Sequence, residues 1–245
     1  MIIDTHAHLN FKAFDDDWKE VIGDCLGEDV WMINVGSKLE TSQKAIEIAE
    51  QYENGIYAAI GTHPIHAQEV FDEKEYERLA VSKKVVAIGE IGLDKFQNYG
   101  EFLEKQEEVL RKQIDLALKL NKPVIIHCRK AHGELLNILK DYPSLRGVIH
   151  CFTGNWKLAQ EYLEMGYFLG INGIIYKLNL KEVIKKAPLD RLLLETDCPY
   201  LGLSEERNDP RFVRHIAKDI ARIKEISFDE VVKTTTQNAQ KLFGI

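Results

Sequence analysis

Long hydrophobic segments, paired cysteines and an excess of positive charge are all missing from this sequence of 245 residues. No apolar run approaches the ~20 residues that a membrane helix needs. The start of the chain lacks the basic residues and apolar stretch of a signal peptide, so we expect a cytoplasmic protein with no membrane association. The formal net charge of -7 argues against a broad basic surface that reads DNA. Any phosphate contacts must therefore come from local lysines, arginines and metal ions.

The sequence has four cysteines, and none of them forms a C-x-x-C pair: Cys25, Cys128, Cys151 and Cys198. A cytosolic chain of this size needs no disulfide framework. The last three each follow a residue that can bind a metal. Because neighbours on a strand point to opposite faces, we expect these cysteines to face outward as small buried hydrophobic residues. A thiolate ligand is the alternative.

Eight short apolar runs alternate with longer amphipathic segments. Their richness in Val and Ile is typical of strands buried on both faces of a parallel sheet; they cover residues 1–3, 30–35, 56–60, 85–88, 123–126, 147–149, 167–171 and 192–194. Helical spacing of apolar residues predicts helices between and after them, including 100–120, 209–223 and 227–243. The last one opens with a capping-box match at Ser227. This alternation over residues 1–245 predicts a single-domain α/β protein, a TIM (β/α)8 barrel, with a doubly wound open sheet as the runner-up.

Metal-capable side chains stand at the carboxyl ends of six of these runs: His6 and His8, His63, Glu90, His127, His150 and Asp197. In a barrel these ends form one face, where barrel enzymes place their active sites. A doubly wound sheet would hold its edge strands far apart. Residues i and i+2 of a strand share a face, so the first two imidazoles can reach one ion. Asp4 would share that face and could orient a ligand.

The number of candidate ligands favours more than one metal ion. One catalytic zinc ordinarily uses three protein ligands, whereas this sequence offers His6, His8, Glu90, His127, His150 and Asp197. We therefore expect two divalent ions with Glu90 as a possible bridge, because two ions about 3.5–4 Å apart clamp a phosphodiester displacement. Mixed His and carboxylate ligands suit Mg, Mn, Zn or Co. We expect no organic cofactor.

Six motifs follow one another in a fixed order along the chain: I-I-D-T-H-A-H-L-N from Ile2, G-T-H-P from Gly61, G-E-I-G-L-D from Gly89, I-H-C-R from Ile126, H-C-F-T-G from His150 and L-E-T-D-C-P-Y from Leu194. Together with R-N-D-P from Arg207 and the segment 238–243, they resemble the signature of the TatD family of metal-dependent deoxyribonucleases, within the amidohydrolase superfamily. The resemblance covers nearly the whole chain.

The resemblance implies a TIM barrel that hydrolyses DNA, typically from a 3′ end. It implies that His6, His8 and Asp197 bind one metal with Glu90, and that Glu90 bridges to a second metal held by His127 and His150. Asp197 would be the acid/base beside a metal-activated water, so Asp197 and Glu90 are the predicted catalytic residues. The predicted substrate is single-stranded or damaged DNA, cleaved by a 3′–5′ exodeoxyribonuclease. The oligomeric state is left open.

Several side chains near the predicted strand ends are candidates for substrate binding. Those that could hold phosphate oxygens are His63, Arg129, Lys177 and Arg207. Tyr200 could stack on a base, whereas Phe152 is expected in the core. Lys95 stands where the family usually has an aromatic residue, and the loop 200–208 looks shorter than usual. Both departures place the substrate preference in doubt more than the catalysis.

Two other functions stay open. The same water could attack another ester or amide, such as a cyclic amide, a phosphotriester or a misacylated tRNA. A non-catalytic metal-binding scaffold is the third hypothesis, and the complete ligand set argues against it.

Overall fold

Eight parallel strands form one sheet in which each strand pairs with the next along the chain. The strands are β1 (Ile2–Ala7), β2 (Val30–Val35), β3 (Ile56–Ile60), β4 (Val85–Asp94), β5 (Val124–Arg129), β6 (Gly147–Ile149), β7 (Phe168–Ile171) and β8 (Leu192–Leu194). This computed structural model describes residues 1–203 and 207–245. Hydrogen bonds from Asp197 N to His6 O (2.8 Å) and from His8 N to Cys198 O (3.0 Å) close the sheet just beyond β8. The TIM-barrel prediction is confirmed, and the open-sheet alternative is wrong.

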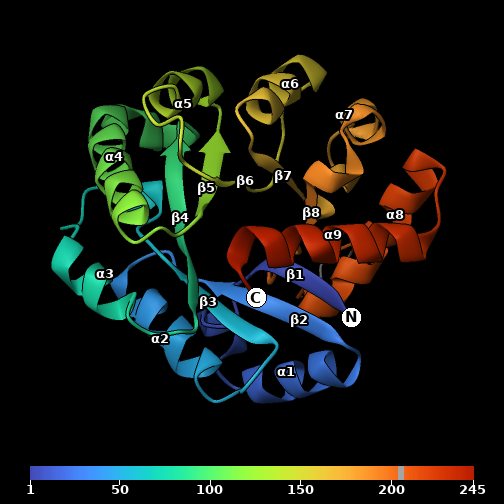
Figure 1. Cartoon of the computed structure of the whole chain (residues 1–245). Coiled ribbons are helices and arrows are strands. Elements are labelled where there is room, and N and C mark those ends of the chain that lie inside the picture. The colour runs from blue at the N-terminus through green and yellow to red at the C-terminus, as the bar shows by residue number, and fades with distance from the viewer. Residues whose placement is uncertain (204–206) are drawn as a thin grey trace.

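Helices surround the barrel (Figure 1). They are α1 (Trp18–Gly27), α2 (Leu39–Ala49), α3 (Glu73–Leu79), α4 (Leu103–Lys119), α5 (His132–Leu139), α6 (Trp156–Glu164), α7 (Lys181–Lys186), α8 (Val213–Lys224) and α9 (Phe228–Phe243). Short 3-10 helices add η1 (Lys12–Phe14), η2 (Pro64–His66), η3 (Gln97–Phe102), η4 (Gly173–Tyr176), η5 (Leu189–Arg191) and η6 (Pro210–Phe212). Among the described residues, no helix combines the length and apolarity needed to cross a membrane.

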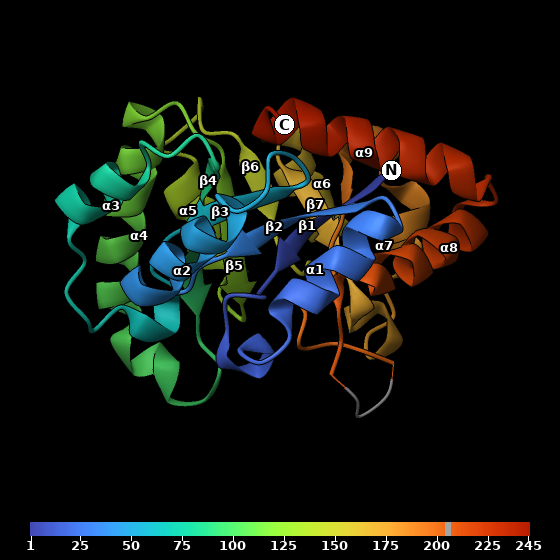
Figure 2. The same cartoon turned by 90° about the horizontal axis from the view of Figure 1, so that it is seen from below.

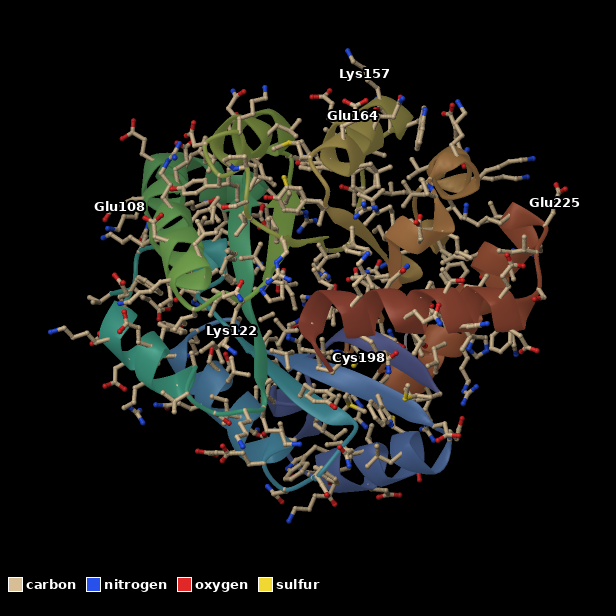
Figure 3. All side chains as sticks on the ribbon, viewed as in Figure 1. Glu108, Lys122, Lys157, Glu164, Cys198 and Glu225 are labelled. Atoms are coloured by element: carbon tan, nitrogen blue, oxygen red, sulfur yellow. The ribbon has the colours of Figure 1, made fainter. Side chains whose placement is uncertain are left out.

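Two buried apolar clusters hold the layers together. The larger lies between the strands and the surrounding helices, and charged side chains such as Glu108, Lys157 and Glu225 project from the outside of the molecule (Figure 3). The smaller cluster includes residues from all eight strands, for example Ile33, Ile125 and Leu193. Side chains from every strand can meet only inside the barrel, so this cluster is the barrel interior.

Helix α9 closes the end of the barrel at which β1 begins (Figure 2). Its Ala239, Leu242 and Phe243 belong to the interior cluster. Asn238 also donates hydrogen bonds to the carbonyls of Leu189 (3.0 Å) and Leu192 (2.8 Å), which fix the helix to the start of β8. Ser227 caps α9 by accepting from Glu230 N (3.1 Å), which is one of the two hydrogen bonds of a capping box. The opposite end of the barrel is therefore the one available for a site.

Register shifts interrupt the regular alternation of β1 and β4. Ile3 belongs to the interior cluster, so strict alternation would turn Ala7 inward and His6 outward. A register shift between Asp4 and Ala7 reverses this order, and Ala7 packs in the outer cluster instead. Strand β4 has a second register shift between Ile88 and Ile91, the interval that contains Glu90. Irregular pairing of this kind re-aims side chains beside active sites.

Candidate metal centre

The predicted ligands converge at the carboxyl end of the barrel. A cavity of about 570 Å³ opens there, and its wall includes His8, Glu90, His127, His150 and Asp197. His6 lies immediately beneath them, fully buried. The loops and strand ends that supply these side chains are spread over almost 200 residues of sequence, so only the closed barrel brings them together.

A first group of possible ligands consists of His6, His8 and Asp197, with Glu90 beside them. The Nε2 atoms of His6 and His8 are 3.1 Å apart. His6 Nε2 is 3.4 Å from Glu90 Oε2, and His8 Nε2 is 3.4 Å from Asp197 Oδ1. Two ligand atoms bound to one tetrahedral zinc would be about 3.3 Å apart. The spacing of this group therefore fits a common cation.

The remaining oxygen of Glu90 faces a second group. Glu90 Oε1 is 2.9 Å from His127 Nδ1, 3.5 Å from His63 Nε2 and 3.8 Å from His150 Nε2. The two carboxylate oxygens of Glu90 thus point to different sets of imidazoles. This is the geometry that a bridging carboxylate requires.

Acceptor atoms at the far side of two rings indicate which nitrogen of each ring faces the site. His8 Nδ1 is 2.8 Å from Val35 O, which can only accept, so this nitrogen carries the proton. His150 Nδ1 lies 3.0 Å from Glu195 Oε1, an ion-pair contact that lacks hydrogen-bond geometry. In each neutral ring the lone pair is then on Nε2, which faces the carboxylates of the site. Such a partner on the outer nitrogen is usual for metal-binding histidines.

His63 has the opposite arrangement. Its Nδ1 accepts a hydrogen bond from Ile65 N (3.2 Å), so the neutral ring carries its proton on Nε2. Nε2 is the atom that faces Glu90, and the ring packs edge-on against His127 at 4.3 Å. In this form His63 is a hydrogen-bond donor toward the cavity rather than a metal ligand.

Burial and neighbouring charges shift the pKa values of the carboxylates. Burial alone would raise the pKa of Glu90, but the imidazoles of His63 and His6 outweigh burial and hold it well below its usual range. Burial also opposes ionisation of Asp197, and His150 and His8 lower its pKa nevertheless. Both carboxylates are therefore anionic at neutral pH and available to a cation.

The pKa values of the histidines move in both directions. Burial, together with the neighbouring His150, lowers the pKa of His6 to about 4. Burial would lower the others too, but the carboxylates of Asp94 and Glu90 raise the pKa of His127 to about 9. Glu195 and Asp197 likewise raise the pKa of His150 to about 10. At neutral pH the centre therefore combines the anionic carboxylates of Glu90 and Asp197 with the cationic rings of His127 and His150.

Two carboxylates that sequence reasoning did not single out position the histidines. Asp94 Oδ2 is 3.0 Å from His127 Nε2, which leaves Nδ1 on the side of Glu90. Glu195 is fully buried and also accepts from Cys151 N (2.6 Å) and Asn172 Nδ2 (3.1 Å). Both lie inside motifs of the sequence, Asp94 four residues after Glu90 and Glu195 two residues before Asp197, and this place beside a predicted ligand is the signal that could have identified them.

Two expectations about the neighbours of the ligands need correction. Asp4 does not touch an imidazole nitrogen: its carboxylate accepts from His6 N (3.1 Å), Thr196 N (2.9 Å) and Thr196 Oγ1 (2.6 Å), because the register shift follows directly after it. Cys128 and Cys198 are buried in the outer cluster as expected, although Cys128 also borders the cavity. Cys151, however, lines the cavity, because it follows the end of β6 with a left-handed φ of 45° and so escapes strand alternation.

The cationic side chains separate into two groups. Arg129 lines the cavity, and its guanidinium lies 3.6 Å from the ring centre of Phe96. Lys177 is exposed on the chain just after η4 and is not part of the cavity wall. Arg207 is also outside this wall, because it pairs through both Nη atoms with Asp17. Of the predicted cationic contacts, only Arg129 is brought to the site.

The two departures from the family pattern lie beside the cavity. Lys95 pairs with Glu134 (2.6 Å), and the neighbouring Phe96 supplies the aromatic ring, under Arg129. The loop 200–208 includes residues 204–206, which lie outside the described residues. Within this loop, Tyr200 lines the cavity and is 55% exposed. Phe152 is buried in the core, as expected.

Comparisons with known proteins identify the family of this chain. A family model described as TatD related DNase matches residues 3–244. A metal-dependent hydrolase of Bacillus subtilis, YabD, which is named as uncharacterized, is 41% identical, with both chains covered completely. The 3′-5′ ssDNA/RNA exonuclease TatD of Erwinia amylovora is 38% identical over 87% of this chain and 88% of its own. The crystal structure of YjjV, a TatD homologue of Escherichia coli, superposes with a TM-score of 0.92 at 31% identity and covers 100% of this chain and 98% of its own. The chain therefore belongs to the TatD family of metal-dependent hydrolases.

Proposed function

We propose that this chain is a two-metal 3′–5′ exonuclease that acts on single-stranded or damaged DNA. The observation that carries the proposal is the position of Glu90, whose two oxygens face separate sets of imidazoles. One set is His6 and His8 with Asp197, and the other is His127 and His150. Divalent ions bound to these sets would supply Lewis acidity at the phosphate and lower the pKa of the attacking water.

Asp197 is the carboxylate best placed to accept the proton of that water. Its side chain is 17% exposed, whereas those of Glu90 and Glu195 are 6% and 0% exposed. The lowered pKa keeps it ionised at neutral pH, and its Oδ1 faces both His8 (3.4 Å) and His150 (3.7 Å). It therefore combines access to the cavity with proximity to both halves of the centre.

Two further side chains support a phosphodiester substrate. Among the described residues, Arg129 has no carboxylate within ion-pair distance, so its charge is free to hold phosphate oxygens. His63 presents an N–H group toward the same cavity. The name of the Erwinia amylovora relative, a 3′-5′ ssDNA/RNA exonuclease, supports the polarity and the single-stranded substrate.

A labelled-oligonucleotide assay tests the reaction. Protein stripped with EDTA is reloaded with Mg, Mn, Zn or Co and given a single-stranded 20-mer labelled at either end. We expect progressive shortening of the 5′-labelled strand and immediate release of a mononucleotide from the 3′-labelled one. No cleavage with any metal would refute the nuclease, and release from the 5′ end would refute the polarity. A panel of cyclic amide, phosphotriester and misacylated tRNA tests the alternative substrates.

The roles of the residues need a second measurement. Calorimetric titration should find two ions per chain, and one ion per chain would contradict a bridging Glu90. Asp197→Asn should lower kcat by a factor of about 10²–10⁴, the usual contribution of a general base. Asp190→Asn, an exposed change in η5 at the opposite end of the barrel, is the matched control and should leave kcat unchanged.

A further inference from the structure

A second cavity of about 470 Å³ lies directly beside the metal pocket. The two share Phe11, Ser37 and Tyr200 as lining residues, so the cavities adjoin at these side chains. The second cavity is built by the segments that follow β1, β2 and β8. A chain-like substrate whose end lies at the metal ligands can therefore continue into it.

Three lysines line this second cavity, which we call the lysine groove: Lys12, Lys38 and Lys44. Lys38 pairs with Glu40 (3.0 Å) and Lys44 with Asp15, and the side chains in both pairs are at least one-third exposed. Exposed pairs of this kind are worth about 0–1 kcal/mol, so a phosphate can compete for the ammonium groups. Lys12 is exposed, and within the described part of the chain no carboxylate lies at ion-pair distance from it. The lining also includes the two partner carboxylates, Asp15 and Glu40, so its formal charge is +1 on a chain with a net charge of -7.

Aromatic rings stand where the two cavities meet. Phe11 stacks on the ring of His8, with 4.2 Å between ring centres and 15° between planes. Tyr200 lies 6.5 Å from the same imidazole, and its ring is 55% exposed. The backbone N–H of Tyr200 is bound to Asp197 O (2.9 Å), which fixes this residue to the site. An exposed ring fixed beside a cationic groove is the combination that single-strand binders use.

We propose that the lysine groove binds the sugar–phosphate backbone of a single-stranded polynucleotide next to the nucleotide being removed, with a base stacked on Tyr200. This inference rests on the proposed nuclease function and adds a binding path to it. The groove, rather than the metal centre, would then set the preferred length of substrate. Stacking and phosphate contacts read no sequence, so the path accepts any bases.

The test compares two triple variants with the same change in charge. Lys12→Gln/Lys38→Gln/Lys44→Gln removes the lysine groove. Lys105→Gln/Lys112→Gln/Lys119→Gln is the control on the outer face of α4, where the lysines also form exposed ion pairs. The steady-state KM is measured for the dinucleotide dTpdT and for a dT 10-mer. Anisotropy in EDTA gives the Kd of a labelled 10-mer at several salt concentrations without turnover.

We expect the groove variant to raise KM and Kd of the 10-mer roughly tenfold at low salt and to leave KM of the dinucleotide and kcat unchanged. Each lost phosphate contact should reduce the salt slope of log Kd by about 0.7, or about 2 for three contacts. Tyr200→Ala should raise the 10-mer Kd further. Equal effects of the two triple variants, or an equal loss for dinucleotide and 10-mer, would overturn the proposal. If wild-type protein binds the 10-mer through the groove but never cleaves it, the groove stands and the nuclease proposal fails.

Discussion

The carboxylate of Asp4 joins β1 to the segment just after β8, and its removal should be costly. It is fully buried and accepts from His6 N and Thr196 N, two backbone groups that cannot turn to another acceptor. Each buried donor left without a partner costs about 1–3 kcal/mol. We therefore expect Asp4→Ala to lower the free energy of unfolding by about 4 kcal/mol, and Tm by about 8–16 °C for a chain of this size.

The matched variant separates hydrogen bonding from charge. Burial raises the pKa of Asp4 well above its usual range, so its negative charge contributes little. Asp4→Asn keeps an oxygen for both amides, and its new N–H₂ group can donate to Thr196 Oγ1. It should cost less than about 1.5 kcal/mol. Urea unfolding of metal-free protein measures both variants. A loss below about 1 kcal/mol for Asp4→Ala, or equal losses for the two, would refute this account of the barrel closure.

Three further predictions concern other parts of the molecule. Phe243→Ala should lower the free energy of unfolding in urea by about 3–5 kcal/mol, because it leaves a cavity in the interior cluster beside α9. Metal affinity should stay unchanged. Burial lowers the pKa of His132 to about 4 from 6.5, so the unfolded chain takes up the proton first as pH falls. Stability relative to His132→Gln should therefore be constant above pH 6.5 and decrease by up to about 3 kcal/mol between pH 6.5 and 4; a flat difference would contradict the buried neutral ring. Arg129→Ala should raise the oligonucleotide KM roughly tenfold, whereas Arg207→Ala, whose guanidinium pairs with Asp17, should change it less than twofold.

The sequence predicts the strands of this protein well because a barrel strand is short, apolar and followed by polar residues. The runs at 30–35, 56–60, 147–149 and 192–194 coincide with β2, β3, β6 and β8. The closed sheet brings the strand ends to one face, so a group of metal-capable residues could be expected there before the structure, whereas the direction of the His6 and Glu90 side chains depends on the register shifts.

Other features depend on contacts that no local pattern encodes. The register shifts before His6 and Glu90 arise from pairing with neighbouring strands, and the sequence has no signal for them. The guanidinium of Arg207 pairs with Asp17, which lies 190 residues earlier in the sequence. The role of Glu195 is equally hidden: Gly170 leaves room for it, since a Cβ there would lie 2.3 Å from its Oε2.

The raised pKa values of His127 and His150 have a consequence for how the centre is loaded. When no metal is bound, both rings are in the positively charged form, with a proton on each nitrogen, at neutral pH. Their charges then balance the buried carboxylates in place of metal ions. A metal that coordinates both rings must release both protons. Loading is then an ion exchange, whose apparent affinity should rise about 100-fold per pH unit between pH 7 and 9.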